Sequence, residues 1–171
     1  MQNTTNTTNT TKRIRFLTYA AVIAALYIVL TYLAQLVGLS GQNAIQCRFS
    51  EALCILPYFT SAAIPGVTLG CFLANLLTGA AWPDLVFGTL ATLIGAVGTR
   101  LLRRWKYLAS VPPILANTLI IPFVVRYAYA NVEESLPFLF LTVFVGELIS
   151  CGLLGTLLQL ALDKRNIFKE I

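Results

Sequence analysis

Long apolar runs limit what this chain can fold into more than any other feature of its sequence. Residues 16–38, 82–99, 109–128 and 137–162 carry very few charged side chains, and residues 44–80 form a further apolar block. A transmembrane helix needs about 20 consecutive apolar residues, whereas the strands of a membrane barrel are about 10 residues long. The chain is therefore expected to be an all-α membrane protein.

The overall composition excludes several functions. Of the 171 residues, 57% are hydrophobic and 11% are charged, whereas soluble domains are about 25% charged. The sequence has no histidine and no phosphate-binding glycine-rich loop, so neither an imidazole metal site nor ATP hydrolysis by that loop is expected. The cysteines form no Cys-x-x-Cys pair and are interpreted as packing residues rather than metal ligands: Cys47, Cys54, Cys71 and Cys151.

The basic residues predict how the chain crosses the membrane. Lys and Arg cluster beside the apolar runs at three places: residues 12–15, 100–106 and 164–169. If the block at 44–80 crosses twice, with a break near Pro57–Pro65, all three clusters fall on the cytoplasmic side, as the positive-inside bias favours. We therefore predict a bundle of six transmembrane helices with both termini in the cytoplasm, in which residues 44–60 and 61–79 form the second and third spans.

Residues 1–11 differ in character from the rest of the chain. They contain three copies of Asn-Thr-Thr, and a short polar repeat of this kind buries too little apolar surface to fold on its own. We expect a disordered cytoplasmic tail over residues 1–11 and a single six-helix transmembrane domain over residues 12–171.

Polar side chains inside the apolar runs are the candidate binding residues, because intramembrane charges are costly and are usually kept for function. In the six-span arrangement they extend from the outer surface to the bilayer midplane: Arg48, Glu51 and Asp84 near the surface, Asn75 below it, and Asn117 and Glu147 about 15 Å deep. The inner half of the bundle carries almost no polar groups. This distribution indicates a pocket that is open to the outside and captures a solute.

The deeper candidates also have structural explanations. Glu147 either meets a ligand or is a protonated acid that ties two helices together. Phe144 lies on the same helix face as Glu147, and it either stacks on a flat ligand ring or faces lipid or the core. Asn75 and Asn117 either read a ligand or hydrogen-bond between helices.

The outer candidates have ordinary explanations as well. Arg48 and Glu51 are three residues apart, so they can pair with each other. Asp84 follows Pro83 at the start of a predicted helix, where proline and an acidic side chain are both common.

Small residues recur four positions apart in the first and third predicted spans. The pairs are Ala20 and Ala24, Ala21 and Ala25, and Gly66 and Gly70. Small residues at this spacing let a second helix approach closely. They form either an internal packing seam or, for the alanines near the cytoplasmic end, a docking surface for a partner subunit.

Several local sequences resemble one transporter family. The matching stretches are residues 48–53 (Arg-Phe-Ser-Glu-Ala-Leu), 56–60, 63–66, 70–71, 74–75, 84–93 and 146–147. Over residues 13–165 the chain resembles the queuosine precursor transporter (QueT) family, which is similar to the substrate-binding S components of energy-coupling factor (ECF) transporters.

The resemblance implies a six-helix S-component bundle in the bacterial plasma membrane that captures a queuosine precursor outside the cell. Such a ligand is a 7-deazaguanine: 7-cyano-7-deazaguanine, 7-aminomethyl-7-deazaguanine or queuine. The implied protein partners are a transmembrane coupling subunit and two cytoplasmic ATPase subunits, so that ATP is used by the partners and this chain binds no cofactor. The implied coupling-subunit interface falls on Ala20, Ala21, Ala24 and Ala25.

The candidate residues suit a ligand of this class. The Glu147 carboxylate can accept a pair of N–H donors from a guanine-like edge, with Asn117 beside it reading the carbonyl or the amine. An aminomethyl cation would meet a second carboxylate, from either Glu51 or Asp84. Which acid meets which edge stays open, as does the 7-deazaguanine that is preferred.

Two other functions are compatible with a polar membrane bundle. A stand-alone secondary transporter would use Glu147 as a proton relay and would need no ATPase partner. An intramembrane enzyme would need an activated nucleophile, and the sequence offers no histidine and no Ser or Cys with an evident base. A transporter subunit rather than an enzyme is therefore expected.

Overall fold

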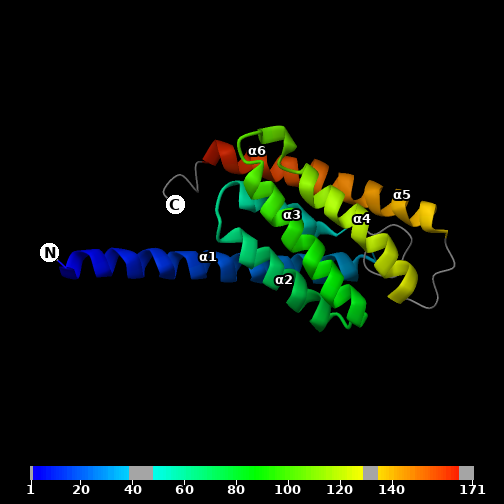
Figure 1. The fold of residues 1–171 in the computed structure, drawn as a ribbon, viewed down its shortest axis with the longest axis horizontal. Coiled ribbons are helices and arrows are strands. Elements are labelled where there is room, and N and C mark those ends of the chain that lie inside the picture. The colour runs from blue at the N-terminus through cyan, green and yellow to red at the C-terminus, as the bar shows by residue number, and fades with distance from the viewer. Residues whose placement is uncertain (1, 39–47, 129–134, 166–171) are drawn as a thin grey trace.

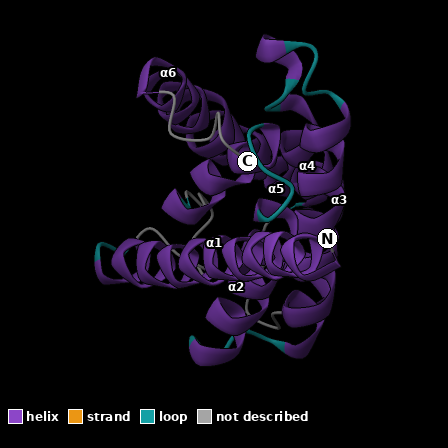
Figure 2. Ribbon diagram, turned by 90° about the vertical axis from the view of Figure 1, so that its left-hand side faces the viewer, coloured by secondary structure: helices purple, strands orange, loops and turns teal. Residues whose placement is uncertain are grey.

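The computed structural model describes residues 2–38, 48–128 and 135–165, and in these ranges the chain forms helices and loops but no strand (Figure 1, Figure 2). The elements are α1 (Gln2–Leu36), η1 (Phe49–Tyr58), α2 (Ala63–Leu77), η2 (Asp84–Gly88), α3 (Thr89–Leu101), η3 (Lys106–Leu108), α4 (Val111–Ala128), α5 (Leu136–Glu147), η4 (Leu148–Leu154) and α6 (Gly155–Arg165). The elements η1 and η3 are 3₁₀-helical, whereas η2 and η4 are π-helical. The prediction of an all-α protein is confirmed for the described residues.

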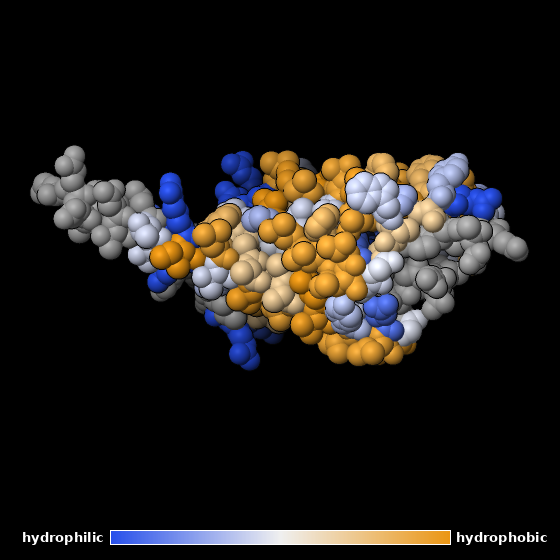
Figure 3. Space-filling model, turned by 90° about the horizontal axis from the view of Figure 1, so that it is seen from below, coloured by the Kyte–Doolittle hydropathy of each residue, from blue (hydrophilic) through white to orange (hydrophobic). Residues whose placement is uncertain are grey.

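Four helical stretches in this part of the chain are long and apolar enough to cross a membrane: Thr10–Leu36, Asp84–Leu101, Lys106–Ala128 and Leu136–Arg165. They coincide with the first, fourth, fifth and sixth predicted spans. Hydrophobic side chains cover the middle of the face shown in Figure 3, as expected for a surface in contact with lipid tails. The chain is therefore a multi-pass membrane protein.

The predicted second and third spans are two shorter apolar helices, η1 and α2. The chain breaks between them at residues 59–62, near the position that Pro57 and Pro65 predict. A 3₁₀-helix rises about 2.0 Å per residue, so η1 is about 20 Å long, more than an α-helix of the same residue count. Pro57 has no N–H to donate, and the chain leaves η1 through a bond from the Phe59 N–H to the Leu56 carbonyl (2.9 Å).

The N-terminal segment differs from the expected disordered tail. The structure continues α1 back to Gln2, so that this helix extends beyond the other helices at its N-terminal end (Figure 1). Nucleation is the costly step of helix formation, and a preformed apolar helix can add turns without repeating it. For this reason residues 2–11 are helical although their composition disfavours independent folding.

The helices α1 and α2 run parallel and pack through their small residues. A Cβ placed on Gly66 would lie 2.9 Å from the Ala20 carbonyl oxygen, and one placed on Gly70 would lie 3.1 Å from the Ala24 Cα. Further along both helices, the Tyr32 hydroxyl donates to the Leu77 carbonyl (3.2 Å). The alanine and glycine patterns are therefore two sides of one internal seam.

This seam changes the predicted docking surface. Ala20 and Ala24 are buried, with 8% and 9% exposure, and the helix that covers them is α2. The prediction that these two alanines face a coupling subunit is therefore corrected, because an internal helix already fills the space that their small side chains leave. Ala21 and Ala25, on the other side of α1, are exposed.

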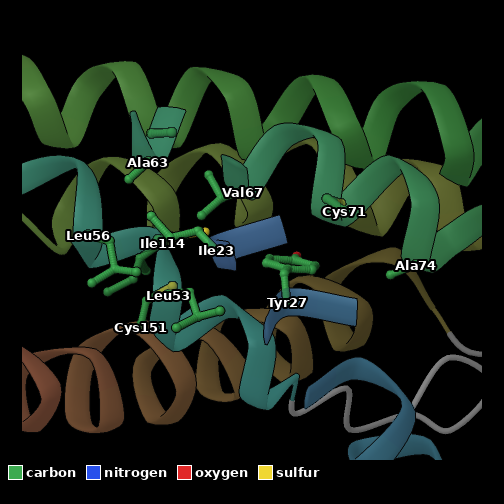
Figure 4. Packing of buried hydrophobic residues seen from close by; sticks show 12 residues of the cluster. Ile23, Tyr27, Leu53, Leu56, Ala63, Val67, Cys71, Ala74, Ile114 and Cys151 are labelled. Carbon is green, nitrogen blue, oxygen red and sulfur yellow. The ribbon is translucent and has the colours of Figure 1, made fainter. Parts of the chain in front are cut away.

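The central core lies where α1, η1 and α2 meet (Figure 4). It contains Ile23 and Tyr27 from α1, Leu53 from η1, and Val67 and Cys71 from α2. The helix pairs α3–α4 and α4–α5 pack beside it. This arrangement surrounds the buried polar residues with apolar side chains from several elements.

Candidate functional site

Five of the predicted site residues are buried in the bundle. They are Glu51, Asn75, Asp84, Asn117 and Glu147, of which Glu51 exposes 1% and Glu147 exposes 6% of the side-chain surface. Burial of ionisable or amide groups is unfavourable unless protein groups or a ligand replace their contacts with water. The contacts of each residue therefore indicate what the site does.

Glu147 is the last residue of α5, and helices on both sides of it supply hydrogen bonds. The Asn117 amide of α4 donates to one carboxylate oxygen at 2.9 Å. The Cys151 thiol, one turn further along in η4, donates to the other oxygen at 3.3 Å. Asn117 and Glu147 therefore lie side by side, and the pair joins α4 to α5.

Glu51 lies in η1 and receives a different set of donors. The Tyr27 hydroxyl of α1 donates to its Oε1 at 2.5 Å, and the Cys54 thiol donates to its Oε2 at 3.1 Å. Oxygen atoms of Glu51 and Glu147 and the Cys151 sulfur lie within 4.8 Å of one another. The fold thus brings together two carboxylates that are far apart in the sequence.

These three groups also form the set among the described residues that is close enough to hold a metal ion. Both carboxylates, however, already accept hydrogen bonds from protein side chains, Asn117 and Cys151 to Glu147, and Tyr27 to Glu51. The geometry is satisfied by protein hydrogen bonds, and it does not point to a metal on its own.

Arg48 precedes η1, and its guanidinium pairs with the Asp84 carboxylate of η2 at 3.4 Å. The possible pair between Arg48 and Glu51 does not form, since within the described chain the Arg48 salt bridge is to Asp84. Asn75 of α2 lies beside this pair and donates to the Asp84 carbonyl oxygen at 3.5 Å. These three residues form a polar layer next to the Glu51–Glu147 pair.

A small cavity lies between this polar layer and the Glu51–Glu147 pair. It is lined by Arg48, Asn117, Ile121, Val143 and Glu147, and its volume is about 10 Å³. About 10–15 Å³ of such volume holds one water molecule, whereas sites for drug-sized ligands measure about 300–1,000 Å³. The structure therefore shows the site closed, with three of the predicted binding residues at its wall.

Phe144 is a predicted site residue that the fold places away from both the cavity and the buried polar residues around it. Its side chain is 38% exposed on the surface of α5, so the lipid-facing alternative describes its position. The aromatic neighbour Phe140 packs edge-to-face on Phe123, with ring centroids 5.4 Å apart. The expected stacking of a flat ring on Phe144 is not supported by this placement.

Sequence reasoning missed Tyr27, Cys54 and the two apolar cavity residues, Ile121 and Val143. A tyrosine inside an apolar transmembrane helix could have been found, because a buried phenol usually has a hydrogen-bond partner. The π-helical turns were also missed. One begins directly after Glu147 and the other begins at Asp84, and π-helical insertions are frequent at functional sites.

The sequence profile of a family described as "QueT transporter" matches residues 17–164. The chain belongs to the QueT transporter family. Over 87 residues it is 38% identical to a protein named "Queuosine precursor transporter QueT" from Lactococcus lactis subsp. cremoris (strain MG1363). The matched stretch spans 50% of the chain and 50% of that relative. No solved structure matches the chain. The description of this family is that of a transporter.

Proposed function

We propose that this QueT family member is the substrate-capture (S) subunit of an ECF-type importer, and that it binds a queuosine precursor outside the cell for ATP-driven uptake. Its ligand would be a 7-deazaguanine such as 7-cyano-7-deazaguanine, 7-aminomethyl-7-deazaguanine or queuine. Support for this ligand class comes from the family and from the name of the relative from Lactococcus lactis.

The observation that carries the proposal is the polar cavity inside an apolar bundle. Glu147 and Asn117 together offer a carboxylate and an amide in hydrogen-bonding contact, and Arg48 adds a cationic donor to the same wall. A carboxylate accepts two parallel N–H bonds from one planar edge, and the amide and guanidinium can pair with a carbonyl and ring nitrogens. A guanine-like edge presents this combination of groups.

The proposal includes six membrane crossings with both termini in the cytoplasm. Residues 48–58 contact the spanning-length stretch Asp84–Leu101 near both of its ends. At one end Arg48 pairs with Asp84 (3.4 Å), and at the other Arg100 donates to the carbonyl oxygens of Pro57 (3.2 Å) and Tyr58 (3.4 Å). A segment with contacts at both ends of a transmembrane helix traverses a similar depth.

The direction of the chain supports the same topology. Since α1 and α2 run parallel, the chain must return between them, and η1 is the helix that lies on the returning segment. With η1 and α2 as crossings, the basic clusters at 12–15, 100–106 and 164–165 share one side, which the positive-inside bias assigns to the cytoplasm of a bacterial plasma membrane.

The proposed partners are a transmembrane coupling subunit and two cytoplasmic ATPase subunits that use the ATP. The sequence has no phosphate-binding loop of its own, which is consistent with ATP hydrolysis by separate subunits. The docking surface is proposed on the exposed side of α1, at Ala21 and Ala25, where small side chains allow another helix to approach closely.

Binding of a 7-deazaguanine by the purified full chain tests this function. Isothermal titration calorimetry in detergent should detect 7-cyano-7-deazaguanine, 7-aminomethyl-7-deazaguanine or queuine in preference to guanine. Glu147→Gln should weaken binding by at least about tenfold, because a hydrogen bond to a charged group is worth about 1.5–3 kcal/mol.

Asp163→Asn is the matched control, because Asp163 pairs with Lys106 away from the cavity. The control should bind like the wild type. If a well-folded wild-type chain binds none of these compounds, the ligand class is wrong. Proton-driven uptake by the chain alone in vesicles would instead support a stand-alone transporter.

A further inference from the structure

Tyr27 is a buried polar residue that the proposed function leaves without a role. It lies in the middle of α1, exposes 2% of its surface, and is the largest of the fully buried side chains in the described chain. Its ring packs in the central core (Figure 4), and its hydroxyl reaches out of the core to the Glu51 carboxylate at 2.5 Å. Ordinary O–H···O bonds measure about 2.7–2.8 Å, and those to a carboxylate are shorter and stronger.

The hydroxyl of Tyr27 is the stronger of the two side-chain donors to Glu51. The other donor is the Cys54 thiol, and thiols are weak donors. One turn along α1, the hydroxyls of Thr31 and Ser50 hydrogen-bond at 3.0 Å, which fixes η1 against α1 at the residue before Glu51. The side chains of Ser50 and Glu51 are therefore both held by α1.

The held carboxylate lies directly behind the ligand cavity. An oxygen of Glu51 and an oxygen of Glu147 are within 4.8 Å of each other, and Glu147 lines the cavity. Among the described residues, no Lys or Arg nitrogen lies within the 4.0 Å salt-bridge distance of either carboxylate, since Arg48 pairs with Asp84. Arg48 lies on the same cavity wall but makes its salt bridge with Asp84, so a cationic group of a ligand can still lower the repulsion between the two neighbouring carboxylates.

We propose that Tyr27 is a positioning residue of the ligand site: its hydroxyl holds the Glu51 carboxylate beside Glu147, and the two carboxylates together select a ligand whose bound edge carries a positive charge. The inference rests on the proposed function and narrows its ligand class. It assigns the aminomethyl cation of 7-aminomethyl-7-deazaguanine to the acid pair and ranks this compound above the neutral 7-cyano compound.

The test is Tyr27→Phe, which keeps the aromatic ring in the core and removes only the hydroxyl. Calorimetry with the full chain measures the dissociation constants of the aminomethyl and cyano compounds. The variant should bind the aminomethyl compound about tenfold more weakly, the size expected for one lost hydrogen bond to a charged group, and the cyano compound with a smaller loss. The selectivity for the cation therefore falls.

Tyr32→Phe is the matched control. Tyr32 is on the same helix, is 39% exposed, and donates to the Leu77 carbonyl rather than to an acid, so its variant should keep the wild-type selectivity. The second control is a double-mutant cycle. Glu51→Gln should reproduce the loss of selectivity, and Tyr27→Phe added to Glu51→Gln should cause no further loss, because Tyr27 acts through Glu51.

Three results would overturn the inference while leaving the proposed function in place. They are a wild type that binds both compounds equally, a Tyr27→Phe variant that weakens both by the same factor, and losses that add fully in the double variant. Equal or additive losses would mean that Tyr27 only stabilises the core. A folded wild type that binds no 7-deazaguanine would overturn the proposed function and this inference together.

Discussion

The seam between α1 and α2 makes a prediction that does not depend on the ligand. In Gly70→Ala, the new Cβ would lie 2.7 Å from the Tyr27 Cβ and 3.1 Å from both the Cα and the carbonyl oxygen of Ala24. Non-bonded carbon atoms are most stable at about 3.5–4.0 Å. Two of the three neighbours are backbone atoms and the third is the first atom of a side chain, so none can rotate away, and α1 and α2 must separate.

The expected cost follows from this overlap. Overpacking a well-packed interior usually costs about 1–3 kcal/mol, whereas replacing glycine by alanine within a helix recovers about 0.5–1 kcal/mol. From the middle of each range, the net loss is about 1 kcal/mol. For chains of about 150–250 residues, each kcal/mol changes the melting temperature by about 2–4 °C, so the expected fall is about 2–4 °C.

Thermal unfolding of the purified chain in one fixed detergent measures this loss. Gly152→Ala is the control, because a Cβ at Gly152 would meet no atom closer than Ile114 Cδ1 at 3.8 Å. That variant should unfold at or slightly above the wild-type temperature. The packing argument is refuted if Gly70→Ala is as stable as Gly152→Ala.

The remaining predictions concern the proposed docking surface and the outer ion pair. Ala25→Leu should leave the melting temperature unchanged but prevent co-purification with a coupling subunit. Ala24→Leu should lower the melting temperature, because Ala24 packs on α2. If both variants behave in the same way, α1 does not have two distinct faces. Arg48→Met should destabilise the fold by about 3 kcal/mol, the lower end for a broken buried ion pair. Adding Asp84→Asn should restore much of that stability. If the double variant melts at the same temperature as Arg48→Met alone, the stability loss does not come from the unpaired Asp84 carboxylate.

The helices of this protein could be predicted from the sequence because membrane insertion leaves a strong signal. Apolar length marked the four spanning stretches, and two prolines marked the break between η1 and α2. The local geometry of η1 could not be read in this way. An apolar ten-residue stretch does not distinguish an α-helix from a 3₁₀-helix, since the two differ in hydrogen-bond register and not in composition.

The contents of the site could be predicted only in part. Polarity inside apolar runs identified Glu51, Asn117 and Glu147, because such groups are rare in a membrane. Their partners depend on which helices become neighbours, and the sequence did not specify that Arg48 meets Asp84 rather than Glu51. Three-residue spacing makes a local pair possible, but the fold places Asp84 of η2 within salt-bridge distance of Arg48.

Helix faces were the least predictable feature. In a soluble protein, polar residues mark the outer face of a helix, but in a membrane the lipid-facing and core-facing sides are both apolar. The three-residue spacing of Phe144 and Glu147 predicted one shared face, but Leu136–Glu147 is apolar almost all round, and Phe144 faces outward while Glu147 is buried. The family resemblance placed all four alanines of α1 on one surface, and the apolar sequence of α1 could not separate the buried pair from the exposed pair.

The polar contacts of the closed site also indicate how it can open. Three of them join different elements: Asn117 and Glu147 join α4 to α5, Tyr27 and Glu51 join α1 to η1, and Arg48 and Asp84 join the residue before η1 to η2. A ligand too large for a cavity of about 10 Å³ must move these elements apart, and its own polar groups must then replace the contacts that separate. The π-helical turns that begin at Asp84 and follow Glu147 depart from the regular α-helical hydrogen-bond pattern directly beside these contacts. We therefore expect ligand binding to be coupled to a rearrangement of the bundle, in which a ligand that matches these polar groups stabilises the open arrangement.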